Sequence, residues 1–442
     1  MQFSNILQTI ATVPSDRVAF IAKSERLTYG EIDKLYHKNL DKIVEIRGSS
    51  VVINGRSRAE FVKLLTCLDG SVGRILFLPK DIDADLVENY YEVSDSNYEV
   101  SMDGDKLVVE TITPFEVSVK EFSTEWIIPT SGTTKTPKLV AHTFESLTRS
   151  TIQDVERGGE FVWGLVFDIY RFSGIQVFLQ ALVGGSTLII PEHNDELSKT
   201  LQFFADNGCN VISATPSFWR KALMTKEVSA LNLKRVTLGG EIADEHILKS
   251  LQHQFTRIKI THIYASTEVG VGFSVTDSKT GFPKSYLDRD DEIQLAIREN
   301  LLWINPNTQT QKYLSSEKMF DEDGFINTGD LVEIRGDRVY FLGRESGAIN
   351  VGGNKVQPEE VEAVLIDTGL VHSAFVYAKK NPMMGAVVCA DIVPMNRAIE
   401  KKVLKKKILA HCKKSLEAFK VPALLKIVDE LTITQSGKLK RS

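Results

Sequence analysis

A loop rich in hydroxyl side chains offers the clearest chemistry in this sequence. The segment Thr130–Lys138, TSGTTKTPK, combines hydroxyls with a glycine and two lysines, and it follows the apolar, strand-like run WIIP. Backbone N–H groups, hydroxyls and cationic side chains are donors that suit polyphosphate oxygens. The loop is therefore a candidate phosphate-binding loop, although a solvated turn can have the same composition.

Two other nucleotide-binding patterns are missing from the sequence. The chain contains no GxxxxGK[ST] segment, and GVGFSV at 270–275 lacks the last glycine of a dinucleotide-binding fingerprint. A P-loop ATPase and a Rossmann enzyme are therefore disfavoured.

The composition is that of an ordinary globular protein. Its 442 residues predict two or three domains, and 43% hydrophobic with 25% charged residues argue against disorder. A net charge of -5 lacks the positive field that nucleic-acid binding needs. We expect no membrane span, because no apolar stretch approaches ~20 residues, and no signal peptide.

The cysteines indicate a cellular compartment. Cys67, Cys209, Cys389 and Cys412 are far apart in the sequence and form no CxxC pair. This spacing suggests neither a zinc site nor a disulfide framework, so we expect a reducing, cytoplasmic location.

Patterns along the chain predict two kinds of architecture. Through the first three quarters, β-rich runs alternate with helical patterns, as in STLIIP before ELSKTLQFFA, which predicts βαβ units and parallel sheet. After about residue 300 strands follow one another, and LVEIRGDRVYFLG predicts a hairpin around Gly336 and Asp337.

The last hundred residues differ in charge from the rest. From Arg344 onward there are 17 basic and 10 acidic residues, against 36 and 48 before it. Pro358 opens a helix with an acidic first turn. A later helix is predicted to be apolar on one face, at Ile399, Val403, Leu404, Ile408, Cys412 and Leu416. Its other face carries mostly lysines, as a solvated surface or a docking surface for an acidic partner.

Five further motifs follow the loop along the chain. They are LGGE at 238–241, YASTE at 264–268, NTGD at 327–330, GRESGAINVGGNKVQPEEVE from residue 343 and SGKLKR at 436–441. From about Leu27 to Arg441 the chain thereby resembles the adenylate-forming superfamily of acyl- and aryl-CoA ligases, non-ribosomal peptide adenylation domains and luciferases. A short acyl- or aryl-CoA ligase is the nearest type.

The resemblance implies an α/β fold in two domains. A large N-terminal adenylation domain with layered parallel and mixed sheets and helices, residues 1–343, would bind ATP and the acid. A hinge at 344–346, with Ser346 as hinge residue, would lead to a small mobile C-terminal α+β lid domain, residues 347–442. Rotation of the lid would let one enzyme perform two half-reactions.

The resemblance also implies a role for individual residues. The ATP-binding set would be Thr130, Ser131, Gly132, Thr133, Thr134, Lys138, Gly239, Gly240, Glu241, Tyr264, Asp330 and Arg344. The catalytic residues would be Lys438, Thr267 and Glu268, with Glu268 also the magnesium ligand. Gly352 and Gly353 would line the thiol channel, and the acid pocket would contain Asp168, Tyr170, Ser173 and Ala265.

These residue types suit the implied chemistry. A carboxylate that attacks the α-phosphorus of ATP brings two anions together, so the site needs cations and donors. Glu268 can hold magnesium while the nucleotide supplies other oxygens. Asp330 can accept from a ribose diol with Arg344 donating, unless the two form a surface ion pair. Tyr264 offers a flat face to adenine or is a core residue, and Lys438 could reach both the substrate carboxylate and the α-phosphate.

Two positions depart from the family pattern. Lys135 stands where the phosphate loop usually has glycine, so it adds a charge and removes a flexible position, which could slow turnover. Asp168 stands where CoA ligases often have a histidine or an aromatic residue. Its carboxylate either faces an amino or hydroxyl group of the substrate or caps the following helix.

The sequence therefore predicts an AMP-forming acid–thiol ligase. Mg2+, ATP and coenzyme A are the implied cofactor and co-substrates, with a small carboxylic acid as substrate. One alternative is an adenylation enzyme that loads an acyl carrier protein. Another is a degenerate binding protein, which Lys135 alone supports.

Overall fold

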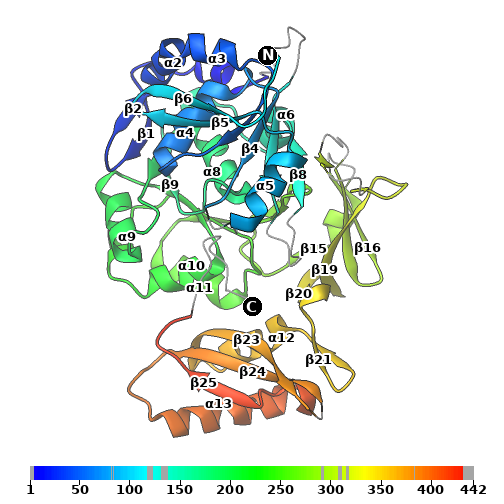
Figure 1. Ribbon diagram of the computed structural model, residues 1–442. Coiled ribbons are helices and arrows are strands. Elements are labelled where there is room, and N and C mark those ends of the chain that lie inside the picture. The colour runs from blue at the N-terminus through cyan, green and yellow to red at the C-terminus, as the bar shows by residue number, and fades with distance from the viewer. Residues whose placement is uncertain are drawn as a thin grey trace.

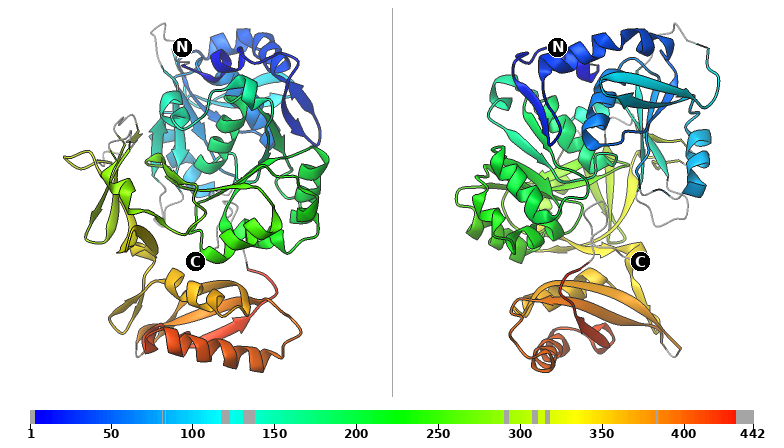
Figure 2. Two further views of the ribbon diagram at one scale, coloured as in Figure 1. Left: turned by 180° about the vertical axis from the view of Figure 1, so that it is seen from behind. Right: turned by 60° about the vertical axis from the view of Figure 1, so that its left-hand side comes forward.

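The structure is a computed structural model that describes residues 4–80, 82, 84–116, 123–130, 138–289, 293–306, 311–314, 318–382 and 384–431. A large body contains residues up to the low 340s, and a smaller body formed by the later residues lies beside it (Figure 1). Figure 2 shows the same division from two further sides.

The first sheet of the large body is mostly parallel and has the order β14-β13-β12-β11-β9-β10-β1-β2. Its strands are β1 (Val18–Ala22), β2 (Arg26–Thr28), β9 (Val162–Leu165), β10 (Thr187–Ile190), β11 (Val211–Ala214), β12 (Arg235–Gly239), β13 (Lys259–Ser266) and β14 (Gly270–Val275). The edge strands β2 and β14 are antiparallel to their neighbours. Runs such as LII and VIS are apolar because parallel strands are covered on both faces.

The second sheet has the order β18-β8-β7-β4-β3-β5-β6. Its strands are β3 (Ser50–Ile53), β4 (Arg74–Phe77), β5 (Tyr98–Asp103), β6 (Lys106–Thr111), β7 (Glu125–Pro129), β8 (Leu139–His142) and β18 (Lys312–Tyr313). Strands β5, β3, β4 and β7 are parallel, and β8 turns back antiparallel to β7. The candidate phosphate loop is the connection between β7 and β8.

Helices cover and join these sheets. They are α1 (Ile6–Ile10), α2 (Tyr29–Lys38), α3 (Leu40–Glu45), α4 (Arg58–Leu68), α5 (Ala84–Val93), α6 (Phe144–Thr148), α7 (Val155–Gly158), α8 (Phe172–Leu182), α9 (Leu197–Asp206), α10 (Pro216–Leu223) and α11 (Glu245–Gln254), with 3-10 turns η1 (Glu227–Ala230) and η2 (Lys284–Asp288). Almost every residue of α4 and α8 is buried, and both contribute to one core with strands of the two sheets. Local sequence sets the helix starts, as where Thr215 caps α10 and Pro216 occupies its first turn.

A third, antiparallel sheet ends the large body, in the order β15-β20-β19-β17-β16. Its strands are β15 (Phe282–Pro283), β16 (Ile293–Arg298), β17 (Leu301–Pro306), β19 (Ile326–Arg335) and β20 (Arg338–Arg344). The predicted hairpin is confirmed, because Ile334 pairs with Val339 and Gly336 has a φ of 62° in the turn.

The small body has its own sheet and core. Its elements are η3 (Glu345–Gly347), β21 (Ile349–Val351), β22 (Asn354–Val356), α12 (Pro358–Asp367), β23 (Val371–Asn381), β24 (Gly385–Pro394), α13 (Lys401–Ser415), η4 (Ala418–Lys420) and β25 (Leu424–Ile427). Leu404, Ile408 and Cys412 are buried in this core, as predicted. The prediction was wrong at Val403, which is 42% exposed. Each residue turns a helix by about 100°, so Val403 is rotated away from the buried Leu404. It lies one turn before Lys407, which is also exposed.

The two bodies touch through α10 and α11 of the large one. His372 Nε2 lies 3.1 Å from the carbonyl oxygen of Arg220, and His246 Nε2 lies 3.8 Å from Asp367 of α12. The predicted α/β class, with a large and a small part, is confirmed. No helix within the described ranges is both long and apolar enough to span a bilayer.

Candidate active site

The two ends of the candidate phosphate loop are held together by strand pairing. Pro129 pairs with Leu139, and the Thr130 N–H donates to the Lys138 carbonyl oxygen at 2.8 Å. Thr130 is buried, whereas the Lys138 ammonium lies 4.8 Å from the centre of the Tyr313 ring. Ser131, Gly132, Thr133, Thr134 and Lys135 lie outside the described residues, as does Lys438.

His142, at the end of β8, connects this hairpin to the YASTE motif. Its Nε2 lies 2.7 Å from the Thr267 carbonyl oxygen, and the side chain is buried. Burial lowers the pKa of His142 to about 4, so the ring is neutral at neutral pH. Sequence reasoning missed this residue, although it is the one strongly polar side chain of the strand LVAH.

Thr267 and Glu268 form the turn between β13 and β14 and are partly exposed. The Glu268 carboxylate has no hydrogen bond or ion pair to another described residue. It therefore fits the single protein carboxylate of a nucleotide-bound magnesium. Where the structure describes the chain, no group of three or more His, Cys, Asp or Glu side chains could hold a metal by itself, so other ligands would have to come from the nucleotide.

Tyr264, Asp330 and Arg344 form one network. The Tyr264 hydroxyl donates to Asp330 Oδ2, and Arg344 forms an ion pair with Asp330, with 2.8 Å between Nε and Oδ1. Burial, then the Asp330 charge, raises the pKa of Tyr264 well above its usual range, so the phenol keeps its proton. A carboxylate oxygen can accept from more than one donor, so a ribose diol can share Asp330 with these partners.

The Tyr264 ring is also part of an aromatic stack. Phe273 of β14 and Phe341 of β20 lie nearly parallel to it, each with its centroid 5.3 Å away. The residue packs against the core of the third sheet, as the alternative prediction has it, and it is only partly buried. The adenine contact stays a prediction.

The LGGE motif ends β12 on the same side of the sheet as the YASTE turn. Gly239 is the last residue of β12, and Gly240 has a φ of 78°, which favours glycine. The Glu241 carboxylate accepts the backbone N–H of Ser217 at 2.9 Å, where α10 begins. Glu241 therefore stabilises a helix start, and its predicted contact with ATP stays a prediction.

Asp168 lies in a buried polar cluster. Its carboxylate accepts the Tyr170 N–H at 3.2 Å and lies 3.7 Å from Arg171 Nε. Burial lowers the pKa of Arg58, and the Asp168 charge opposes that change. Asp168 thus braces the turn before α8, although the residue that caps the helix is Arg171. A carboxylate with these partners does not need a donor from the substrate.

The other predicted acid-pocket residues differ in exposure. Tyr170 is buried, its hydroxyl donates to the Gly55 carbonyl oxygen at 2.8 Å, and its ring packs on Phe61. Ser173 and Ala265 are partly exposed. The burial of Tyr170 does not favour its predicted contact with the acid.

The predicted hinge and thiol-channel residues lie on the chain between the two bodies and just beyond it. Ser346 is exposed in η3, directly after β20. Gly352 and Gly353 form the turn of the β21–β22 hairpin with φ values of 58° and 92°. A Cβ at Gly352 would lie 2.7 Å from Met384 Cε, the end of a flexible and exposed side chain, so the positive φ and not this contact favours glycine here.

Comparison with known families matches both parts of the chain. The AMP-binding enzyme family matches residues 35–293, which is more than half of the chain. The chain belongs to the AMP-binding enzyme family. The C-terminal domain of AMP-binding enzymes also matches, over residues 360–438.

Relatives of this AMP-binding enzyme are ligases. The 2-succinylbenzoate–CoA ligase of Listeria innocua is 28% identical over 333 residues, 72% of this chain and 68% of that protein. The enzyme of the same name from Bacillus subtilis is 22% identical over 99% of this chain and 96% of its own. A D-alanine–D-alanyl carrier protein ligase of Bacillus velezensis is 23% identical over 100% and 98%. The predicted class, an AMP-forming acid–thiol ligase, is confirmed.

Solved structures share the fold. The o-succinylbenzoate CoA synthetase of Bacillus subtilis, in complex with its acyl-adenylate intermediate, has a TM-score of 0.73 at 20% identity and covers 99% of this chain and 97% of its own. ATP-bound MatB from Rhodopseudomonas palustris has a TM-score of 0.77 at 16% identity, with coverage of 99% and 97%.

Proposed function

We propose that this AMP-binding enzyme joins a small carboxylic acid to Mg-ATP, releases pyrophosphate and passes the acyl group from AMP to coenzyme A. One observation carries the proposal. The end of β13 holds Tyr264 in the Asp330–Arg344 network, and the following Thr267 is bound to His142, which ends the strand after the phosphate loop. One strand end therefore joins the residues proposed for adenine, ribose, magnesium and phosphate.

The proposed pose of ATP follows from this arrangement. The ribose diol would donate to Asp330, whose position Arg344 and Tyr264 fix. The phosphates would extend past Glu268 toward the loop between β7 and β8. Bound magnesium would reduce the repulsion between the attacking carboxylate and the nucleotide phosphates. Lys438 would stabilise negative charge near the α-phosphorus during adenylation.

We further propose the domain limits 1–343 and 347–442 with a hinge at 344–346. The separate core of the small body supports them, because Ile349 is the first residue of that core and Phe341 belongs to the core of the third sheet. Only exposed residues, Arg344 to Gly347, connect the two. Rotation there would replace Lys438 at the active site with the Gly352–Gly353 turn for thiol transfer.

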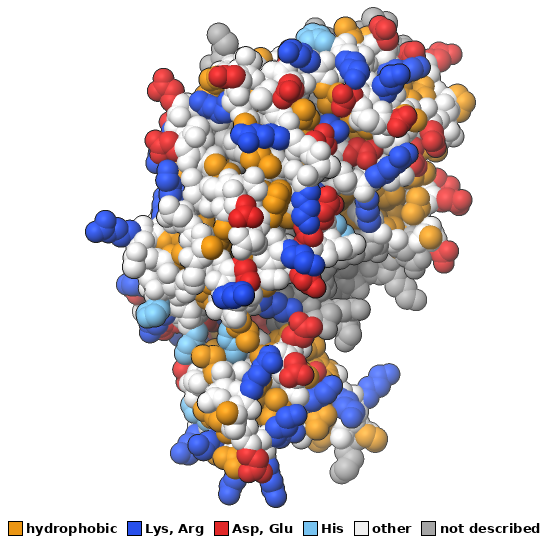
Figure 3. Space-filling model, turned by 90° about the vertical axis from the view of Figure 1, so that its left-hand side faces the viewer, with side chains coloured by type: hydrophobic (Ala, Val, Ile, Leu, Met, Phe, Trp, Pro, Cys, Tyr) orange, Lys and Arg blue, Asp and Glu red, His pale blue; other side chains and the backbone are white. Residues whose placement is uncertain are grey.

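A carrier protein is the second candidate for the thiol acceptor. The side of the small body seen in Figure 3 carries many Lys and Arg side chains. On α13 the exposed lysines are Lys401, Lys402, Lys406, Lys407, Lys413 and Lys414. Such a face complements the negative charge of an acidic carrier, and carrier-protein ligases occur among the relatives.

We also propose a cytoplasmic location. The four cysteines are free thiols and all are buried. Free thiols persist where the compartment is reducing.

The test is a screen of carboxylic acids for acid-dependent pyrophosphate release from ATP. The protein should release pyrophosphate only when a suitable acid is present. That acid should then form a thioester with coenzyme A. An acyl-adenylate that reacts with a carrier protein and not with coenzyme A would support the second candidate. ATP binding without pyrophosphate release for any acid would favour the degenerate binding protein.

A further inference from the structure

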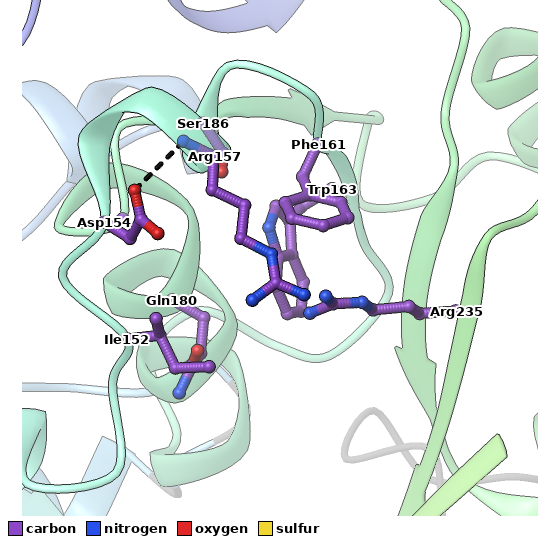
Figure 4. A pocket seen from close by; sticks show the side chains of 10 residues that line it. Ile152, Asp154, Arg157, Phe161, Trp163, Gln180, Ser186 and Arg235 are labelled. Atoms are coloured by element: carbon purple, nitrogen blue, oxygen red, sulfur yellow. Dashed lines mark hydrogen bonds between the residues drawn. The ribbon is translucent and has the colours of Figure 1, made fainter. Parts of the chain in front are cut away.

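A small cavity lies at the end of the first sheet opposite the candidate active site. It has a volume of about 40 Å3, is partly open to solvent, and is lined by residues of α7, the beginning of β9, the beginning of β12 and the last turn of α8. Arg157 itself is exposed. The carboxyl end of β12 carries Gly239, whereas Arg235 at its amino end lines the cavity (Figure 4). The cavity is therefore separate from the site described above.

Two arginines converge on this cavity. The guanidinium groups of Arg157 and Arg235 point toward one another in front of the Trp163 ring (Figure 4). Neither has an ion pair with a carboxylate of the described residues. Burial lowers the pKa of Arg235, and the Arg157 charge lowers it further, because like charges at short range repel. The Glu160 charge opposes both changes, but the ion pair of Glu160 is with Lys234 and not with either arginine.

The cavity also contains a buried donor without an acceptor. The Trp163 Nε1 atom is inaccessible to solvent and has no hydrogen-bond partner. Buried N–H groups almost always have an acceptor, so this donor can serve an oxygen of a bound ligand. Phe161 packs on Arg235, with 4.2 Å between the guanidinium carbon and the ring centre, which fixes that guanidinium in place.

No carboxylate of the described residues forms an ion pair with either arginine. Asp154 lines the cavity, but its Oδ1 accepts the backbone N–H of Arg157 at 3.1 Å, as the cap of α7. Glu160 lies 3.9 Å from the Lys234 ammonium. Among the residues that line the cavity, two arginines thus face one carboxylate, Asp154.

We propose that the cavity binds one phosphate group, held by the guanidiniums of Arg157 and Arg235 and by the indole N–H of Trp163. Arginine donates paired hydrogen bonds to phosphate oxygens, and two arginines can hold several of them at once. A single water needs about 10 to 15 Å3 of such space, so the volume admits a group of a few heavy atoms, such as a phosphate. The group would be a free phosphate ion or the terminal phosphate of a monoester.

Titration calorimetry of the full chain with inorganic phosphate tests the proposal. The wild-type protein should bind phosphate, and Arg157→Gln and Arg235→Gln should each weaken binding at least tenfold. Trp163→Phe keeps the ring and removes the N–H, so it should weaken binding severalfold. Arg335→Gln is the control, because Arg335 is exposed and paired with Glu333, and its affinity should equal that of the wild type.

Thermal unfolding provides a second measurement. Phosphate should raise the unfolding midpoint of the wild type and of Arg335→Gln, since a ligand that binds only the folded state stabilises it. The two cavity arginine variants should show no such rise. Glycerol 3-phosphate, titrated in parallel, separates a site for monoesters from a site for the free ion.

The proposal is overturned if millimolar phosphate does not bind, or if it binds equally well to both cavity arginine variants. Equal binding would place the ion elsewhere, for instance at the phosphate loop. Pyrophosphate release in the acid screen does not depend on these two arginines, so the proposed function can fail or succeed independently.

Discussion

Acid should destabilise the large body of this enzyme through His142. The side chain is 1% exposed, and its Nε2 lies 2.7 Å from the Thr267 carbonyl oxygen. Burial lowers its pKa to about 4, whereas an unfolded chain has a histidine pKa of about 6.5. Between these two values the unfolded state binds a proton that the folded state does not.

The sign and size of the effect follow from this difference. His142 stabilises the fold fully above about pH 6.5, and the contribution falls as the pH drops toward 4, because protons then favour the unfolded chain. A pKa that differs by one between the folded and unfolded states corresponds to about 1.4 kcal/mol, so the full contribution of His142 is about 3 kcal/mol. About 2 kcal/mol of it should be lost between pH 7.5 and pH 5.

Urea unfolding followed by tryptophan fluorescence measures this loss. All four tryptophans, Trp126, Trp163, Trp219 and Trp303, precede residue 343, so the signal reports the large body. His142→Gln keeps an N–H that can donate to Thr267 but does not titrate. We expect the free energy of unfolding of the wild type to fall by about 2 kcal/mol more than that of His142→Gln over this pH range.

A matched control is His37→Gln, because His37 is 63% exposed on α2. It should lose as much stability as the wild type. If the wild type and His142→Gln lose the same free energy between pH 7.5 and pH 5, the burial of a neutral His142 is not what makes the protein sensitive to acid.

Three further predictions concern the chemistry. Lys438→Ala should abolish pyrophosphate release while supplied acyl-adenylate is still consumed with thiol, and equal loss of both half-reactions would contradict the role of Lys438 in adenylation alone. Glu268→Gln should raise the magnesium requirement and depress adenylation with little change in the free energy of unfolding; an unchanged magnesium dependence would exclude Glu268 as the ligand. Asp168→Ala should lower stability by about 1–3 kcal/mol, because it leaves buried donors unpaired. It should leave unchanged the ratio of catalytic efficiencies for an acid and its amino counterpart, and a shifted ratio would instead place Asp168 in the acid site.

The sequence by itself determined the features that depend on neighbouring residues. Gly336 and Asp337 between alternating apolar residues were sufficient to predict the β19–β20 hairpin, and Pro358 marked the first turn of α12. The ordered motifs also identified the family, since each is a short segment whose residues act together. Such features need only backbone preferences and contacts within a few positions.

Only the tertiary structure decided which distant residues meet. His142 and Thr267 are 125 residues apart, Tyr264 and Asp330 are 66 apart, and Tyr170 and Gly55 are 115 apart. These pairs depend on the positions of β8, β13, β19 and α8 in or between the sheets, which no local pattern encodes. The arginine-lined cavity has the same origin, because β9 and β12 begin beside α7 only after the crossovers of the first sheet have formed. Long-range packing therefore sets the surroundings of His142, whereas the contacts of Asp168 with Tyr170 and Arg171 span only two or three residues.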